Sequence, residues 1–313
     1  MMRSLLRLVL ACLTTMTLVL EAAAATRVWV AVAEEGGAYA EAAAALRAEL
    51  ADGAEIGSGK WQALFDGQEG MPDLIVTVGV AAFDGALERL AQKEAAWARV
   101  PVLAILLPQA VFEARMASGP VVQRPISAVV LDQPLGRQMA FIKRALPDRR
   151  HVGVLSGTQT RPLLKALEKE ASGRGLRLMS APVANAPDDL YPALRSVLEE
   201  ADVLLALPEP AVYNSGTLQN ILLTTYRART PLVAFSPAYV KAGAVLALYS
   251  TPAQVARRAA EIVREWRAGR GLPAVQAPRE FTVVLNAKVA ASLGLQIDDA
   301  NAIVESLRRQ EGR

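Results

Sequence analysis

The residue types that most enzymes use for covalent or metal-assisted chemistry are nearly absent from this chain. It has one histidine, His151, and one cysteine, Cys12, among 313 residues. The chain therefore lacks the residues for a Cys–His nucleophile pair or for a zinc centre built from Cys and His. His151 stands before an apolar run, at the end of a parallel strand opposite to the one where ligands bind. We interpret it as a boundary residue and expect a protein that is not an enzyme.

Sequence signatures of phosphate binding and of an activated serine are also missing. Glu34 and Glu35 precede Gly36 and Gly37 after the first predicted strand, where a dinucleotide-binding protein carries G-x-G-x-x-G. Two carboxylates at that turn would repel a pyrophosphate. Ser156 follows a strand but lacks the flanking glycines of a nucleophile elbow. We expect no cofactor and no metal.

A different kind of site is indicated by the glycine, polar and aromatic residues that follow the predicted strands. In open α/β sheets, ligands bind beyond the carboxyl ends of the strands. Each residue also has a structural interpretation, with glycine as a turn, Ser or Asn as a helix cap and Tyr as rim packing. A zwitterionic ligand would need a cation as well, for which Arg161 and Lys241 are the candidates. The predicted ligand-binding residues are Gly36, Gly37, Tyr39, Gly79, Val80, Ser156, Gly157, Thr158, Glu209, Tyr213, Asn214, Ser236 and Tyr239.

These residues depend for their positions on an alternation of strands and helices. Apolar runs predict strands over 28–33, 74–79, 102–107, 126–131, 152–156, 176–183, 203–207, 232–236, 245–249 and 281–285. Helical patterns occupy 39–50, 83–98, 135–146, 163–172, 190–200, 217–226, 252–268 and the C-terminal tail. Most strands lack period-2 alternation, which is typical of parallel strands covered on both faces. The sequence predicts two Rossmann-like α/β lobes with parallel sheets, and no convincing strand over 51–71.

The first 25 residues have the pattern of a signal peptide. Arg3 and Arg7 precede an apolar run over 8–20, and alanines at 22–25 suit signal peptidase. The run is shorter than the roughly 20 residues that span a bilayer. An alternative is a lipobox at 9–12 with a lipid anchor on Cys12, although the apolar stretch would then continue into the mature chain. We expect a cleaved leader and a periplasmic protein.

The overall charge argues against one class of partner. The chain has 34 Lys and Arg against 31 Asp and Glu, for a net charge of +3. No basic stripe interleaved with aromatic residues accompanies this small excess, so we expect no nucleic-acid partner.

Several segments of the second half resemble the ABC-transporter substrate-binding protein family, in a subgroup of uncharacterised transport components from Gram-negative bacteria. The likeness is strongest at 207–214, 221–227 and 231–244. Four further segments agree in order and spacing, namely 131–134, 249–252, 281–286 and 290–295. The chain departs from the family pattern at Glu209, where most members carry Asp.

The resemblance implies the type I periplasmic binding fold, in which two lobes are joined by three hinge crossings. We place these crossings at 132–134, 250–252 and 277–279. The predicted lobes are residues 26–131 with 252–277, and residues 132–251 with 278–313.

The same resemblance implies a monomeric receptor that traps a small molecule of unknown identity and delivers it to the permease of an ABC importer. The alternative is a periplasmic sensor or regulatory module for a membrane kinase or an outer-membrane uptake system. An exported hydrolase or isomerase, and a degenerate lobe pair without a ligand, are less favoured.

Overall fold

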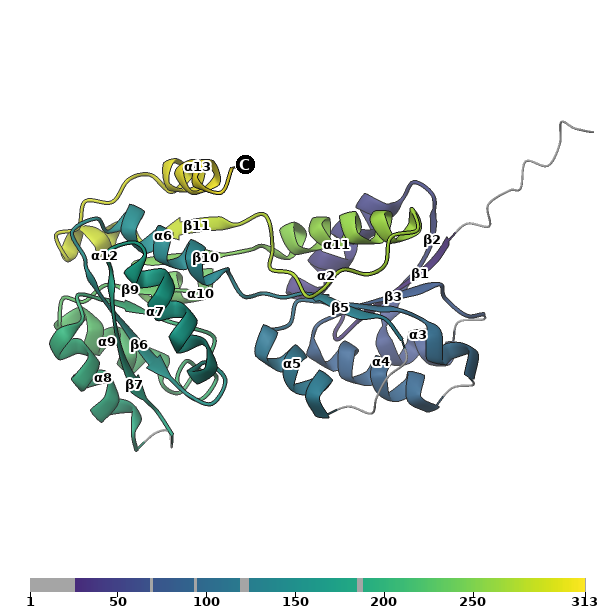
Figure 1. Ribbon diagram of the computed structural model, residues 1–313, viewed down its shortest axis with the longest axis horizontal. Coiled ribbons are helices and arrows are strands. Elements are labelled where there is room, and N and C mark those ends of the chain that lie inside the picture. The colour runs from purple at the N-terminus through teal and green to yellow at the C-terminus, as the bar shows by residue number, and fades with distance from the viewer. Residues whose placement is uncertain (1–25, 68–69, 93–94, 119–123, 185–187, 313) are drawn as a thin grey trace, which may run out of the picture.

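The computed structural model describes residues 26–67, 70–92, 95–118, 124–184 and 188–312. The predicted leader over 1–25, with Cys12, lies outside these residues. Figure 1 shows two α/β lobes that lie side by side and are connected by extended segments of chain. In the part of the chain that the structure describes, no helix has the length and apolar character to cross a membrane.

The first lobe is built on a five-stranded parallel sheet with strand order β2-β1-β3-β4-β5. Its strands are β1 (Thr26–Val32), β2 (Ala54–Lys60), β3 (Leu74–Val78), β4 (Val102–Ile105) and β5 (Ile126–Val129). Helices α2 (Gly37–Leu50) and α11 (Pro252–Arg267) bury one face of this sheet. The other face is covered by α3 (Trp61–Gly67), α4 (Val80–Gln92), α5 (Gln109–Ser118) and the 3₁₀ helix η1 (Ala95–Arg99).

The second lobe has a six-stranded sheet with strand order β11-β10-β9-β8-β6-β7. Its strands are β6 (His151–Ser156), β7 (Arg177–Pro182), β8 (Val203–Leu205), β9 (Leu232–Ala234), β10 (Leu246–Tyr249) and β11 (Thr282–Leu285). β11 runs antiparallel to β10, which departs from the predicted all-parallel sheet. The reason is its connection, because the chain enters β11 from the first lobe and not through a crossover helix.

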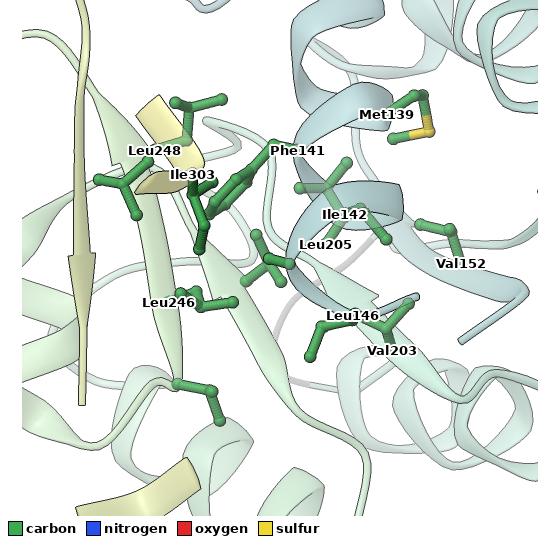
Figure 2. Packing of buried hydrophobic residues seen from close by; sticks show 14 of the residues in the cluster. Met139, Phe141, Ile142, Leu146, Val152, Val203, Leu205, Leu246, Leu248 and Ile303 are labelled. Atoms are coloured by element: carbon green, nitrogen blue, oxygen red, sulfur yellow. The ribbon is translucent and has the colours of Figure 1, made fainter. Parts of the chain in front are cut away.

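Helices bury both faces of the second sheet. On one face lie α6 (Leu135–Ala145), α7 (Leu164–Ser172), α12 (Ala287–Ser292) and α13 (Ala300–Gln310). On the other lie α8 (Leu190–Glu200), α9 (Leu218–Arg227) and α10 (Pro237–Ala242), while a 3₁₀ turn, η2 (Arg161–Leu163), precedes α7. Figure 2 shows Phe141 and Ile142 of α6 in the core with Leu205 and Leu248 of the sheet. Full burial of each such side chain contributes roughly 1.5–3 kcal/mol.

The strand β2 corrects the expectation that residues 51–71 contain no second strand. β2 pairs in parallel with β1 along its whole length, from Thr26 beside Ala54 to Val32 beside Lys60. It lies at the edge of the sheet and none of its residues is fully buried. An edge strand with glycine and polar residues has no continuous apolar run, so its sequence carries little strand signal.

The chain passes between the lobes three times. The first passage follows β5 and leads into α6 through 130–134, and the second leads from β10 to α11 through 250–251. The third starts at Gln276, whose N–H donates to the Ala128 carbonyl and whose carbonyl accepts the Val130 N–H, both at 2.9 Å. It then runs through 277–281 into β11. The lobe boundaries given above stay a prediction.

A buried guanidinium, that of Arg137 in α6, binds the first and third passages together. Its side chain is 1% exposed. It donates to the Gln133 side-chain oxygen at 2.8 Å and to the carbonyls of Pro278 and Arg279 at 3.0 and 3.3 Å. The Glu311 carboxylate accepts two further bonds at 2.6 and 2.9 Å. One side chain therefore joins α6, both passages and the C-terminal end of the chain.

The second passage is joined to the same network through Ser250. The Gln133 side-chain amide donates to the Ser250 hydroxyl at 2.9 Å, and this hydroxyl donates to the Glu280 carbonyl at 2.5 Å. The Arg137 guanidinium also lies 4.3 Å from the centre of the Phe281 ring. The three passages thus share one continuous set of hydrogen bonds.

We predict that Arg137→Met lowers the free energy of unfolding by about 3 kcal/mol, because it leaves buried acceptors without their donor. The control is Arg144→Met on the same helix, whose ion pair with Asp298 is exposed at 31% and 59%. Loss of that pair costs at most about 1 kcal/mol. Urea unfolding of the two variants measures the difference, and equal losses would contradict a special role for the buried network.

Candidate ligand-binding cleft

A cavity of about 620 Å³ lies between the two sheets, beside the three passages. Both lobes contribute to it through residues at or beyond the carboxyl ends of their strands, and the second lobe also contributes residues of α6. From the first lobe come Ala38, Tyr39, Leu106, Pro108 and Gln109. The passages contribute Leu131, Asp132, Gln133, Pro134, Ser250 and Ala277, and Pro252 is the first residue of α11. The second lobe contributes Leu135, Gln138, Phe141, Leu163, Leu205, Leu207, Pro208, Val233, Ala234, Phe235, Ser236, Pro237, Leu248 and Tyr249.

The walls of this cavity are mainly aliphatic and aromatic. Leu106 turns the chain after β4 with a φ of 56°, a left-handed conformation that is rare for a large side chain. Such a backbone costs of order 1–3 kcal/mol and is held only where its surroundings require it. Polar groups are few, and two of them, Gln133 and Ser250, are engaged in the network of the passages. The arrangement suits a small organic molecule with an apolar body.

Of the predicted ligand-binding residues, Tyr39 and Ser236 line the cavity. Tyr39 belongs to the first turn of α2, and a side chain at Gly79 would overlap its ring. Gly79 also has a φ of 93°, a conformation that favours glycine. The Ser236 hydroxyl caps α10 by accepting the Ala238 N–H at 3.2 Å. Gly36 and Gly37 are exposed at the start of α2, and half-buried Val80 begins α4.

The remaining predicted residues lie around the ends of β6, β8 and β9, outside the cavity lining. Ser156 and Gly157 are buried, whereas Thr158 and Asn214 are exposed. The Asn214 side chain holds its own loop by donating to the Pro210 carbonyl at 2.9 Å. A role for these residues in ligand binding stays a prediction.

The Glu209 carboxylate is buried inside the second lobe and accepts hydrogen bonds from the loop after β6. It is 3% exposed. One of its oxygens accepts the backbone N–H groups of Gln159 and Thr160 and the Thr160 hydroxyl, all at 3.0 Å. The loop passes so close that a methyl group at Gly157 would overlap this carboxylate. Glu209 therefore holds the loop after β6 in place.

Three aromatic rings form a cluster beside the cavity. The rings of Phe235 and Tyr239 are 4.9 Å apart, and that of Tyr213 lies 6.2 and 6.5 Å from them. The Tyr239 hydroxyl donates to the Tyr213 carbonyl at 3.2 Å. Burial raises the pKa of the Tyr213 hydroxyl far above its ordinary value. Tyr213 thus acts as a core residue that supports Phe235, the member of the cluster in the cavity wall.

Several residues that line the cavity are not among the ligand-binding residues that the sequence predicts. Leu106, Pro108 and Gln109 follow β4, so the rule of strand ends would have found them. Asp132 and Ser250 were assigned to hinge passages alone. Their spatial proximity to the second sheet depends on how the two lobes face each other, for which the sequence has no local signal.

The described residues contain no cluster of three or more His, Cys, Asp or Glu side chains suited to a metal ion. His151 is the first residue of β6, with its Nδ1 3.4 Å from an Asp202 oxygen. It thus lies at the amino end of its strand, opposite the end that faces the cavity.

Two α/β lobes joined by three passages, with a cavity between their carboxyl edges, define a binding protein of the type I periplasmic class. The sequence model of the family described as ABC transporter substrate binding protein matches residues 123–306. The chain belongs to this family. It is therefore a solute-binding protein of the ABC transporter family and not an enzyme.

Solved structures have the same fold at low sequence identity. A ligand-free, open substrate-binding protein with adhesive properties from Clostridium difficile is 14% identical, with a TM-score of 0.66, and the match covers 89% of this chain and 98% of that one. A conserved domain protein from Vibrio cholerae is 19% identical, with a TM-score of 0.57, over 90% and 98%. An ABC domain from Streptococcus pneumonia in complex with L-Trp is 14% identical, with a TM-score of 0.56, over 89% and 98%. No curated protein matches the chain.

We predict that Glu209→Ala lowers the free energy of unfolding by about 2–4 kcal/mol, because it leaves three donors of the loop after β6 without an acceptor. The matched control is Glu199→Ala, which removes an exposed carboxylate from α8. That change is expected to alter stability by less than about 0.5 kcal/mol. Chemical denaturation measures both, and an unaffected Glu209→Ala variant would contradict the structural role.

Proposed function

We propose that this protein is an exported receptor that traps a small organic solute between its lobes and delivers it to the permease of an ABC importer. The cavity beside the passages supports this proposal most directly. A ligand that touches both lobes favours the conformation in which they approach each other, in proportion to its difference in affinity for the two states. The closed pair of lobes then presents a new surface to a membrane partner.

The composition of the cavity wall supports an organic ligand with an apolar portion. Tyr39 approaches from the first lobe, and Phe235 and Tyr249 approach from the second. Aromatic side chains on opposing lobes are suited to contact both faces of a flat apolar group. The related structure from Streptococcus pneumonia is in complex with L-Trp, whose side chain is such a flat apolar group.

The two sheets also place both cavity walls on rigid elements. Most wall residues lie in helices, at the ends of strands or directly after them, so movement of one lobe against the other would change the cavity without unfolding either core. The passages at 130–134, 250–251 and 277–281 are the positions where such a movement would be absorbed. This supports a trapping mechanism over a static site.

A thermal-shift screen of the purified protein against amino acids, amines, nucleosides, vitamins and sugars tests the proposal. Endogenous ligand is first removed by mild unfolding and refolding. A solute at 100 times its dissociation constant stabilises the fold by about 2.7 kcal/mol, which is readily detected. A cooperatively melting protein that responds to no solute would contradict the receptor function.

We predict that Tyr39→Ala weakens binding of the solute found in this screen by tenfold or more, through loss of an aromatic wall of the cavity. The control is Tyr226→Ala, which removes an aromatic ring that is 45% exposed on α9 and absent from the cavity lining. Isothermal titration calorimetry compares the two. Equal affinities would place the ligand elsewhere.

Export with removal of the leader is tested by determining the N-terminal residue of the mature protein. We predict that the protein recovered from the periplasm begins at Thr26, and that Cys12→Ala changes neither its export nor its release in soluble form. N-terminal sequencing and metabolic labelling with palmitate measure this. A lipid-labelled protein that depends on Cys12 would instead indicate an anchored receptor.

A further inference from the structure

We propose that the solute carries a positively charged group on an apolar body, and that the Asp132 carboxylate binds this group. The inference rests on the proposed function and specifies the chemical class of its ligand. It assigns Asp132, in the first passage between the lobes, as a specificity-determining residue.

Asp132 is the one charged side chain among the described residues that line the cavity. The other polar groups of the wall are amides and hydroxyls, and the basic residues near the strand ends, Arg161 and Lys241, are not part of it. An anionic or zwitterionic ligand would therefore meet no cation in this wall. A ligand with a single positive charge would meet the negative charge of the Asp132 carboxylate.

The Asp132 carboxylate has hydrogen-bond partners but no basic partner in the described structure. One of its oxygens accepts the Gln109 N–H at 2.6 Å. The described residues place no Lys or Arg in an ion pair with it. Burial raises the pKa of Asp132, and the nearby Glu113 acts in the same direction. A partly buried carboxylate without a counter-ion is costly, and an ammonium or amidinium group on the ligand would offset that cost.

The aromatic wall favours the same ligand charge. Tyr39, Phe235 and Tyr249 line the cavity, and a cation is attracted to the face of an aromatic ring. Burial raises the pKa of the Tyr249 hydroxyl, and the negative charge of Glu41 acts in the same direction. Glu113 near Asp132 and Glu41 near Tyr249 thus add negative charge close to the cavity wall.

A purely structural role for Asp132 is the competing explanation. Gln109 is the first residue of α5, so the Asp132 carboxylate caps that helix although it lies in another part of the sequence. The substitution Asp132→Asn separates the two roles, because asparagine retains an oxygen that accepts the Gln109 N–H and loses the negative charge. A cap requires the oxygen, whereas recognition of a cation requires the charge.

The test uses three probes with one carbon skeleton and different charges: 4-phenylbutylamine, 4-phenylbutanol and 4-phenylbutyrate. Titration calorimetry at pH 7 is done on the full exported protein, on Asp132→Asn and on Asp148→Asn. Asp148 is an exposed residue outside the cavity lining, so its variant controls for the change in net charge. We expect the amine to bind at least tenfold more tightly than the alcohol or the acid. Asp132→Asn should abolish that preference with a small change in melting temperature, and Asp148→Asn should retain it.

Other results overturn the inference. An alcohol or acid that binds as tightly as the amine, or an amine preference that survives Asp132→Asn, excludes a cation site at Asp132 and leaves solute trapping intact. If none of the three probes binds, the charge of the solute found in the thermal-shift screen tests the inference instead. A neutral, anionic or zwitterionic solute overturns the inference, as does a cationic solute that binds Asp132→Asn with unchanged affinity. A cationic solute that loses affinity in Asp132→Asn supports it. Absence of any ligand in both experiments removes the proposed function together with the inference.

Discussion

The position of one lobe relative to the other depends on the hydrogen bonds of the buried Arg137 guanidinium. Each lobe has its own sheet and its own cores, so the contacts of the passages set where one sheet lies against the other. Arg137 bonds the first and third passages, and Gln133 carries the network to Ser250 in the second. A charge removed from water is tolerated only with such complete pairing. The pairing holds the three passages together.

The cavity follows from this arrangement and from the direction of the strands. Parallel strands that are connected by helices expose their loops at the carboxyl edge, and the passages turn the two carboxyl edges toward each other. The wall is apolar because it includes residues such as Leu106 and Leu207, which closely follow the buried strands β4 and β8. Among the described residues that line the cavity, Asp132 is the one with a charged side chain, and it lies in the first passage.

The strands with continuous apolar runs agree with the predicted ranges to within two residues at each end, since their apolar runs leave a strong signal. The edge strand β2 was missed for the opposite reason, because its residues are only partly buried and include two glycines. Among candidate ligand contacts, Glu209 and Tyr213 follow strand ends as expected, yet both point into the second lobe. Glu209 accepts bonds from its own loop, and Tyr213 packs in the core. A strand end predicts proximity to the site, whereas the local packing decides which side chain faces it.

The sequence by itself determined the alternation of strands and helices, the two-lobed class and the family, because these depend on periodic burial and on local motifs such as 231–244. It also determined the scarcity of catalytic groups, which is a matter of composition. Only the tertiary structure decided that residues 106–109, 131–134 and 248–252 meet in one cavity and that Asp132 is the charge within it. These segments are far apart in the chain, and their meeting depends on long-range contacts of the Arg137 network that no local pattern encodes.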